Sequence, residues 1–112
     1  MTSFSKRAAK HFVLIKAAKE FKKEIEKAGV DNLTTLADAG QSIIGTYLRG
    51  CSEKERGRLR KDLNTLLQMG ITVDMLLDEV ARQIPKVGPI MKTRERYRKS
   101  EIQNVTAFLK ES

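Results

Sequence analysis

Residues 52–84 read SEKERGRLRKDLNTLLQMGITVDMLLDEVARQI, and this pattern predicts two helices separated by a short break. Ser52 and Glu55 form a capping box at the start, in which each side chain bonds the other residue's backbone N–H group. Gly70 is expected to end the first helix, because glycine adopts the left-handed conformation without strain, and Thr72 caps the second. The two expected helices cover residues 53–69 and 73–84.

Apolar side chains recur at helical spacing in both of these helices. Those of the first form one stripe, whereas those of the second surround most of its circumference. The second helix is therefore expected at the centre of the fold, with the leucine stripe of the first packed at a small crossing angle. The stripe is Leu59, Leu63, Leu66 and Leu67, and the central helix contributes Met75, Leu76, Leu77, Val80, Ala81 and Ile84.

Two further helices are expected before this stretch. Over residues 5–28 the apolar residues alternate spacings of four and three, and Gly29 ends the pattern. The next helix is expected over residues 32–49, with Asp31 as its N-cap. Both helices have an apolar side that must pack against a neighbour, so they are expected to contribute to one core.

Gly40 and Gly45 fall inside the expected helix of residues 32–49. Each lowers helix propensity by about 1 kcal/mol relative to alanine, which suggests that another helix backbone crosses closely there. Packing within the chain is the favoured interpretation of this helix. The alternative is a homodimer that associates through residues 33–48.

The prolines and glycine after the central helix predict a linker over residues 85–99, which carries six Lys or Arg residues against one Glu. Ser100 then opens a second capping box, S-x-x-Q, ahead of a last helix over residues 101–111. A longer helix that begins at Arg94 is the alternative. The shorter helix is favoured because Arg98 would lie on the apolar side of the longer one.

The whole composition fits one globular domain: of 112 residues, 40% are hydrophobic and 32% are charged. The expected fold class is all-α, a compact bundle of four to five helices without β-sheet. Cys51 has no second cysteine to pair with, which favours a reducing, cytoplasmic location. No apolar run approaches the length of a membrane span, so no integral membrane association is expected. The basic residues 1–19 leave a mitochondrial targeting segment as an alternative.

Catalytic chemistry has little basis in the sequence. His11 and Cys51 lie forty residues apart, and no glycine-rich phosphate loop or nucleophile elbow is present. Asp74 and Asp78 are one helical turn apart, but two carboxylates are too few for a tight cation site. We therefore expect a protein that is not an enzyme and that has no metal ion or cofactor.

The formal net charge of +8 favours binding to polyanions or acidic surfaces. Two helical ridges and the basic linker carry cations suited to phosphate contacts. Tyr97 lies among them and is expected either to stack on an unpaired base or to pack on the core. These features predict an accessory or regulatory protein that binds DNA or RNA. The expected contacts are Lys16, Lys19, Lys23 and Lys27 on the first ridge, Lys54, Arg58 and Lys61 on the second, and Arg94, Arg96, Tyr97 and Arg98 in the linker.

The break at Gly70 invites comparison with a helix-turn-helix, but the charges fit poorly. The helix that would enter the DNA groove carries Arg82 against three acids, which phosphates would repel. The alternative function is a protein–protein interaction module or inhibitor. In that case an apolar seam would bind the partner, and the basic flanks would attract an acidic protein.

Overall fold

The computed structural model describes the backbone of residues 2–111 and the side chains of residues 9–29 and 31–111. Over this part of the chain there are seven helices and no strand. The predicted all-α class is confirmed, whereas the expected number of four to five helices is too low. The helices are α1 (Thr2–Ala28), α2 (Val30–Asp38), α3 (Ile43–Gly50), α4 (Glu53–Gln68), α5 (Val73–Gln83), α6 (Gly88–Thr93) and α7 (Glu95–Lys110).

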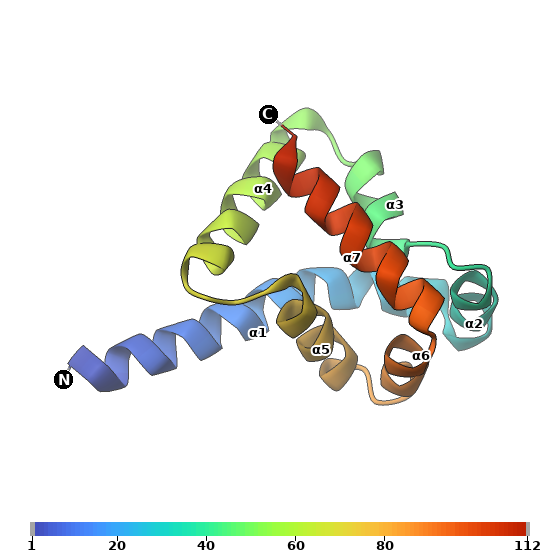
Figure 1. Cartoon of the computed structure of the whole chain (residues 1–112), viewed down its shortest axis with the longest axis horizontal. Helices are drawn as coiled ribbons and strands as arrows, with labels where there is room; N and C mark the ends of the chain where they lie inside the picture. Colours follow the sequence, from blue (N-terminus) through green and yellow to red (C-terminus); the bar gives the residue numbers. More distant parts are fainter. Residues whose placement is uncertain (1, 112) are drawn as a thin grey trace.

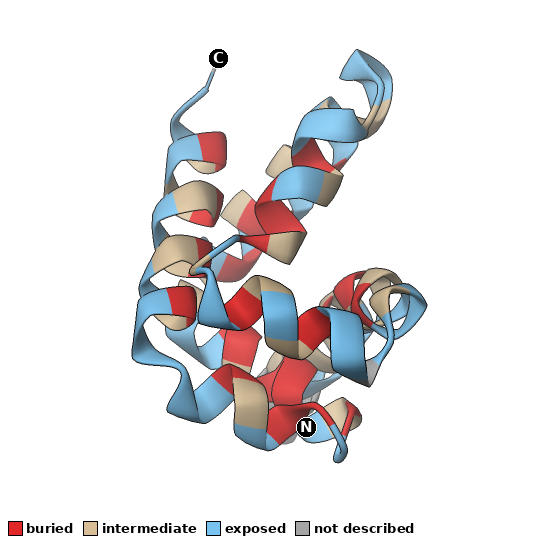
Figure 2. Ribbon diagram, turned by 90° about the vertical axis from the view of Figure 1, so that its right-hand side faces the viewer, coloured by how far each residue is buried: buried red, intermediate tan, exposed pale blue. Residues whose placement is uncertain are grey.

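α1 is the longest helix, and its first half projects beyond the rest of the molecule (Figure 1). α5 packs against α1, α6 and α7, as expected of a central helix. A side-chain hydrogen bond reinforces the α1–α5 contact, because Gln83 Nε2 donates to the backbone oxygen of Ile15 at 3.1 Å. Buried residues of the helices face one another across the interior (Figure 2).

α4 and α5 begin at the caps that the sequence predicts, but only half of the predicted capping box forms, because the carboxylate of Glu55 pairs with Arg58 instead of the backbone N–H of Ser52. Ser52 Oγ accepts the backbone N–H of Glu55 at 3.2 Å, and Thr72 Oγ1 accepts that of Met75 at 3.1 Å. Gly70 has a φ of 86°, in the left-handed region. Two predicted core residues differ, since Leu67 and Met75 are 41% and 38% exposed.

The helix expected over residues 32–49 is in fact two helices. α2 ends before Gly40, whose φ is 71°, and Ser42 caps α3 by accepting the backbone N–H of Gly45 at 2.8 Å. The expected N-cap at Asp31 is also wrong, because α2 begins two residues earlier than expected, with Gly29 as its N-cap and Asp31 in its first turn. Gly40 thus favours the end of one helix, and Ser42 favours the start of the next. These local preferences outweigh the continuous apolar pattern, which predicted a single helix.

The linker expected over residues 85–99 contains α6 and the first turn of α7. α7 begins at Glu95, so the longer helix is correct and Ser100 lies inside it rather than at a cap. Arg98 does fall on the packed side of α7, but Asp74 and Asp78 of α5 pair with its guanidinium at 2.9 and 3.0 Å. These ion pairs offset the cost of placing a cation there.

α3 and α7 pack closely, as the glycine at position 45 predicts. A Cβ atom on Gly45 would lie 2.7 Å from Cβ of Asn104, so only glycine fits at this crossing. Gly40 differs, because it lies in the α2–α3 turn and faces the Arg96 side chain rather than a helix backbone. Four of the apolar residues expected at a homodimer seam over residues 33–48 are buried within the chain, and others are only partly buried. The buried ones are Leu33, Ala37, Ile44 and Leu48, and the partly buried ones include Ile43 and Tyr47.

No helix of the described residues is long and apolar enough to cross a membrane.

Candidate interaction surface

Two of the three predicted basic surfaces lie beside each other, one on α1 and one on α4. The link between them is Arg58 of α4, whose Nη1 lies 3.1 Å from Oε1 of Glu20 on α1. The lysines on both sides of this link are exposed and form no ion pair with any described side chain. They are Lys16, Lys19 and Lys23 on α1, and Lys54 and Lys61 on α4.

Arg58 itself is held by three carboxylates. Its guanidinium pairs with Glu55 and Asp62 of α4 as well as with Glu20 of α1. The hydrogen bonds to Glu55 and Glu20 raise the pKa of Arg58 above its ordinary value, and the bond to Arg58 in turn lowers the pKa of Glu55. Lys27 is likewise paired, with Glu24 at 3.1 Å. These two predicted phosphate contacts therefore have their charge offset within the chain.

The third predicted surface, residues 92–99, lies at the opposite end of the molecule from α4 (Figure 1). Arg94 pairs with Asp38 at 2.8 Å, and Arg98 with the two aspartates of α5. Tyr97 is 1% exposed and donates its hydroxyl to Glu101, so it has no face available for a base. Of the four contacts predicted here, Arg96 alone is exposed and forms no ion pair within the described side chains.

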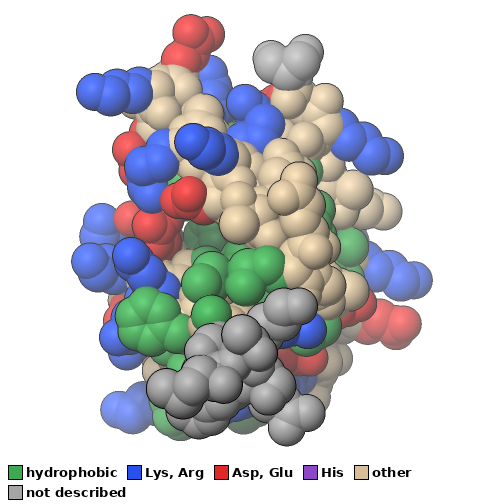
Figure 3. Space-filling model, turned by 90° about the vertical axis from the view of Figure 1, so that its left-hand side faces the viewer, with side chains coloured by type: hydrophobic (Ala, Val, Ile, Leu, Met, Phe, Trp, Pro, Cys, Tyr) green, Lys and Arg blue, Asp and Glu red, His purple; other side chains and the backbone are tan. Residues whose placement is uncertain are grey.

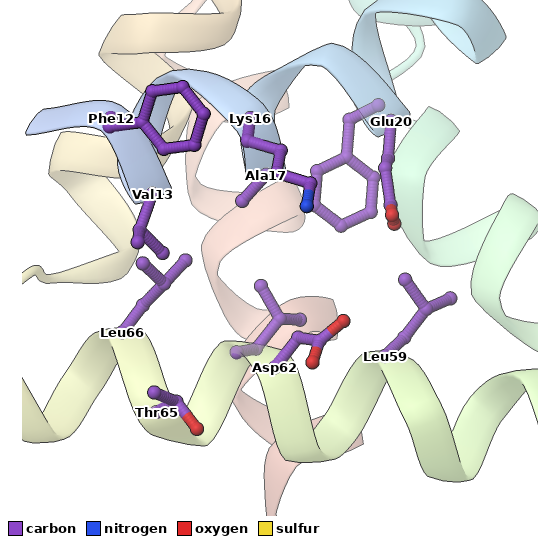
Figure 4. A pocket seen from close by; sticks show the side chains of 11 residues that line it. Phe12, Val13, Lys16, Ala17, Glu20, Leu59, Asp62, Thr65 and Leu66 are labelled. Carbon is purple, nitrogen blue, oxygen red and sulfur yellow. The ribbon is translucent and has the colours of Figure 1, made fainter. Parts of the chain in front are cut away.

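An open apolar groove of about 230 Å³ separates α1 from α4, and we call it the α1–α4 groove. Figure 4 shows the side chains that face it, with Val13 pointing toward Leu66 at one end and Glu20 opposite Leu59 at the other. α1 and α4 therefore run antiparallel along it. The lining residues are Phe12, Val13, Lys16, Ala17, Glu20 and Phe21 of α1, and Leu59, Asp62, Leu63, Thr65 and Leu66 of α4.

Phe12 stands at the edge of this groove and is 66% exposed, more than any other large hydrophobic residue described. Figure 3, which views the molecule from this end, shows a patch of hydrophobic side chains with Lys and Arg side chains along one side of it. Lys16 follows Phe12 by one turn, and its amine points into the mouth of the groove (Figure 4). The arrangement is an apolar channel with one cation at its mouth, Lys16, that forms no ion pair with a described side chain, whereas its two acids, Glu20 and Asp62, are paired with Arg58.

Sequence reasoning missed this groove, although one signal was present. Phe12 lies about 160° around α1 from Leu14, at about 100° per residue, so it falls on the polar side with Lys16. A large aromatic residue on a lysine-rich side has no partner in its own helix. Such a residue marks either an interaction surface or a contact with another helix.

The described residues form no candidate metal site. Within the described ranges, no three His, Cys, Asp or Glu side chains come together as a metal site would require. Comparison of the chain with models of known protein families, with curated proteins and with solved structures finds no match.

Proposed function

We propose that this protein is a non-enzymatic interaction module, and that the α1–α4 groove binds a helix of an acidic partner protein. The observation that carries the proposal is Phe12, which is 66% exposed at the edge of an apolar groove. Exposed aromatic side chains beside a hydrophobic groove are typical of surfaces that bind an amphipathic helix. Burial of Phe12 by the partner would remove apolar surface from water.

The dimensions of the groove suit a short helix. Its lining runs from Phe12 to Phe21 along α1, ten residues whose ends lie about 13.5 Å apart at 1.5 Å per residue. That length matches two to three turns of a bound helix. Leu59, Leu63 and Leu66 form an apolar floor along the same span of α4.

The positive charge of the chain favours an acidic partner over a second copy of the chain. The chain carries a net charge of +8, and exposed lysines without an ion pair to any described side chain lie on both helices that form the groove. A second copy of this chain would bring these lysines together and would be repelled. An acidic partner would instead be attracted, which raises the rate of association.

Nucleic-acid binding is the second candidate, favoured by the same lysines. Lys16, Lys19 and Lys23 lie on α1, and Lys54 and Lys61 lie on α4, the helix that Arg58 links to α1. Five exposed cations without an ion pair to any described side chain are therefore available for phosphates. The observations against it are the ion pairs of the other predicted cations and the burial of Tyr97. An apolar groove also has no role in contacts to a phosphate backbone.

The test is site-specific photo-cross-linking in the native cell. Phe12 is replaced by p-benzoylphenylalanine, and Leu67, which is 41% exposed on α4 but does not line the groove, is replaced in the matched control. We expect position 12 to capture an acidic helical segment of one protein, with little capture from position 67. The purified segment should bind the chain, and Phe12→Ser should weaken that binding.

Two other results would contradict the proposal. Adducts at position 12 that disappear after nuclease treatment would favour the nucleic-acid candidate. Equal capture from positions 12 and 67 would show that the groove has no special role. Because Phe12 is largely exposed, neither the cross-linker nor Phe12→Ser is expected to unfold the chain.

A further inference from the structure

We infer that the bound helix carries an apolar residue and a carboxylate three or four positions apart, and that Lys16 selects the carboxylate. This inference rests on the proposed function and specifies the partner's sequence. Phe12 and Lys16 occupy the same edge of α1 and are one turn apart. A helix that lies along this edge meets an apolar contact and a cation at the spacing of its own turns.

The apolar contact lies at the Phe12 end of the groove. Val13 of α1 and Leu66 of α4 point toward each other there (Figure 4), and Phe12 stands open to solvent beside them. A leucine, phenylalanine or methionine of the partner would fill this end. Because α1 and α4 run antiparallel, the seated helix must follow both of them, which fixes its axis along the groove.

Lys16 has no ion-pair partner among the described side chains, and its amine points into the groove. The nearest acids that line the groove, Glu20 and Asp62, are both paired with Arg58. Lys16 is therefore the lining cation that is free to pair with a ligand. A carboxylate one turn from the apolar residue would reach it.

Arg58 lies close to the groove but has a different role. It links α1 to α4 through Glu20, and it is shared with Glu55 and Asp62. A partner carboxylate near Arg58 would face three carboxylates already present, which would repel it. Selection of the partner's acid is thus confined to the Lys16 end of the groove.

The inference is tested by selection from a display library of helical peptides, about 15 residues long and randomised on one side. The baits are the full chain and its Lys16→Glu, Lys16→Gln, Lys99→Glu and Phe12→Ser variants. Lys99 is the matched control, because it is exposed on α7, forms no ion pair with any described side chain and does not line the groove. Circular dichroism checks that each variant keeps its helix content.

Peptides selected by the unchanged chain should have Asp or Glu three or four positions from an apolar residue. Replacing that acid by its amide should weaken binding about two- to fivefold, the range of an exposed ion pair. The same replacement in the peptide should not weaken its binding to the Lys16→Gln variant. The Lys16→Glu variant should select peptides with Lys or Arg at the same position. Lys99→Glu should select the same peptides as the unchanged chain.

Two outcomes would overturn the inference, and they are distinguishable. Peptides that need Phe12 but show no acid preference, or the same preference on Lys16→Glu, would refute selection by Lys16 and leave the groove as the docking site. Peptides that bind Phe12→Ser as well as the unchanged chain would refute the proposed function too.

Discussion

The hydroxyl of Tyr97 donates a 2.6 Å hydrogen bond to the fully buried carboxylate of Glu101, one turn further along α7. The same carboxylate accepts the hydroxyl of Ser42 and the backbone N–H groups of Ile43 and Ile44. Glu101 therefore caps the start of α3 from a different helix. Four donors satisfy a charge that would otherwise be costly to bury.

Replacing Glu101 by alanine should destabilise the fold strongly. The change leaves the Ser42 and Tyr97 hydroxyls and two backbone N–H groups without an acceptor, and each costs about 1 to 3 kcal/mol when buried and unpaired. We expect a loss of about 3 kcal/mol or more in the free energy of unfolding, measured by urea denaturation. Gln103→Ala, at an exposed position of α7, is the control. A loss below about 1 kcal/mol would mean that the cap is dispensable.

The two tyrosines should titrate well above the ordinary pKa. Burial and the nearby Cys51 raise the pKa of Tyr47 to about 12, and burial together with the charge of Glu101 raises that of Tyr97 further. The absorbance of the folded chain at 295 nm should therefore show no transition near pH 10. Such a transition while the helices remain folded would show that one tyrosine is freely accessible.

The raised pKa of Tyr97 also makes stability depend on pH. The native state keeps Tyr97 protonated while the unfolded chain ionises near pH 10, so its contribution is complete below that pH and falls as pH rises. Urea denaturation at pH 8, 10 and 11 should show this decline. In Tyr97→Phe the alkaline decline should be smaller, although the variant is less stable at every pH. An equal decline in both proteins would assign it to other groups.

Two glycines should respond to alanine in opposite directions. A Cβ on Gly45 would meet Ser42 Oγ at 2.5 Å and Asn104 Cβ at 2.7 Å, so Gly45→Ala should cost about 1 to 3 kcal/mol. Nothing lies within 4 Å of a Cβ on Gly57, so Gly57→Ala should stabilise α4 by about 0.5 to 1 kcal/mol. Thermal unfolding of both variants measures the contrast. Equal effects would mean that α3 and α7 are not in close contact.

Arg98 and Lys99 are adjacent in sequence, but replacing each by alanine should change the free energy of unfolding by different amounts. Arg98 is tied to Asp74 and Asp78 and its side chain is only 19% exposed, whereas Lys99 is exposed. We expect Arg98→Ala to cost about 1 to 2 kcal/mol and Lys99→Ala less than about 0.5 kcal/mol. Chemical denaturation distinguishes them. A neutral Arg98→Ala would make Arg98 available as a binding residue, as the sequence first suggested.

Local signals in the sequence predicted the fold well where local interactions decide it. Ser52, Gly70 and Thr72 end or begin helices through interactions within a few residues, and the structure confirms these predicted helix ends. The predicted start of α7 is wrong because the correct start depends on residues of another helix. Arg98 is acceptable on a packed side only because α5 presents two aspartates, and no local pattern shows that pairing.

The candidate site was less predictable for the same reason. The lysine ridges could be read from helical spacing, but their position beside each other depends on how α1 and α4 pack. The ion pairs Arg58–Glu20 and Arg94–Asp38 join residues far apart in sequence, and no local pattern shows them. Glu55 and Asp62, in contrast, lie one turn to either side of Arg58 on α4, so helical spacing alone indicates those two pairs. The groove exists only between two helices and has no motif of its own.

The most direct test of the central claim is a ¹⁵N NMR titration of the full chain with the peptide that the library selects. If the α1–α4 groove is the docking site, the largest amide shifts will fall on Val13, Ala17, Leu63 and Leu66, and Phe12→Ser will reduce them. Shifts confined to the basic residues 92–99, or spread evenly over the seven helices, would contradict it.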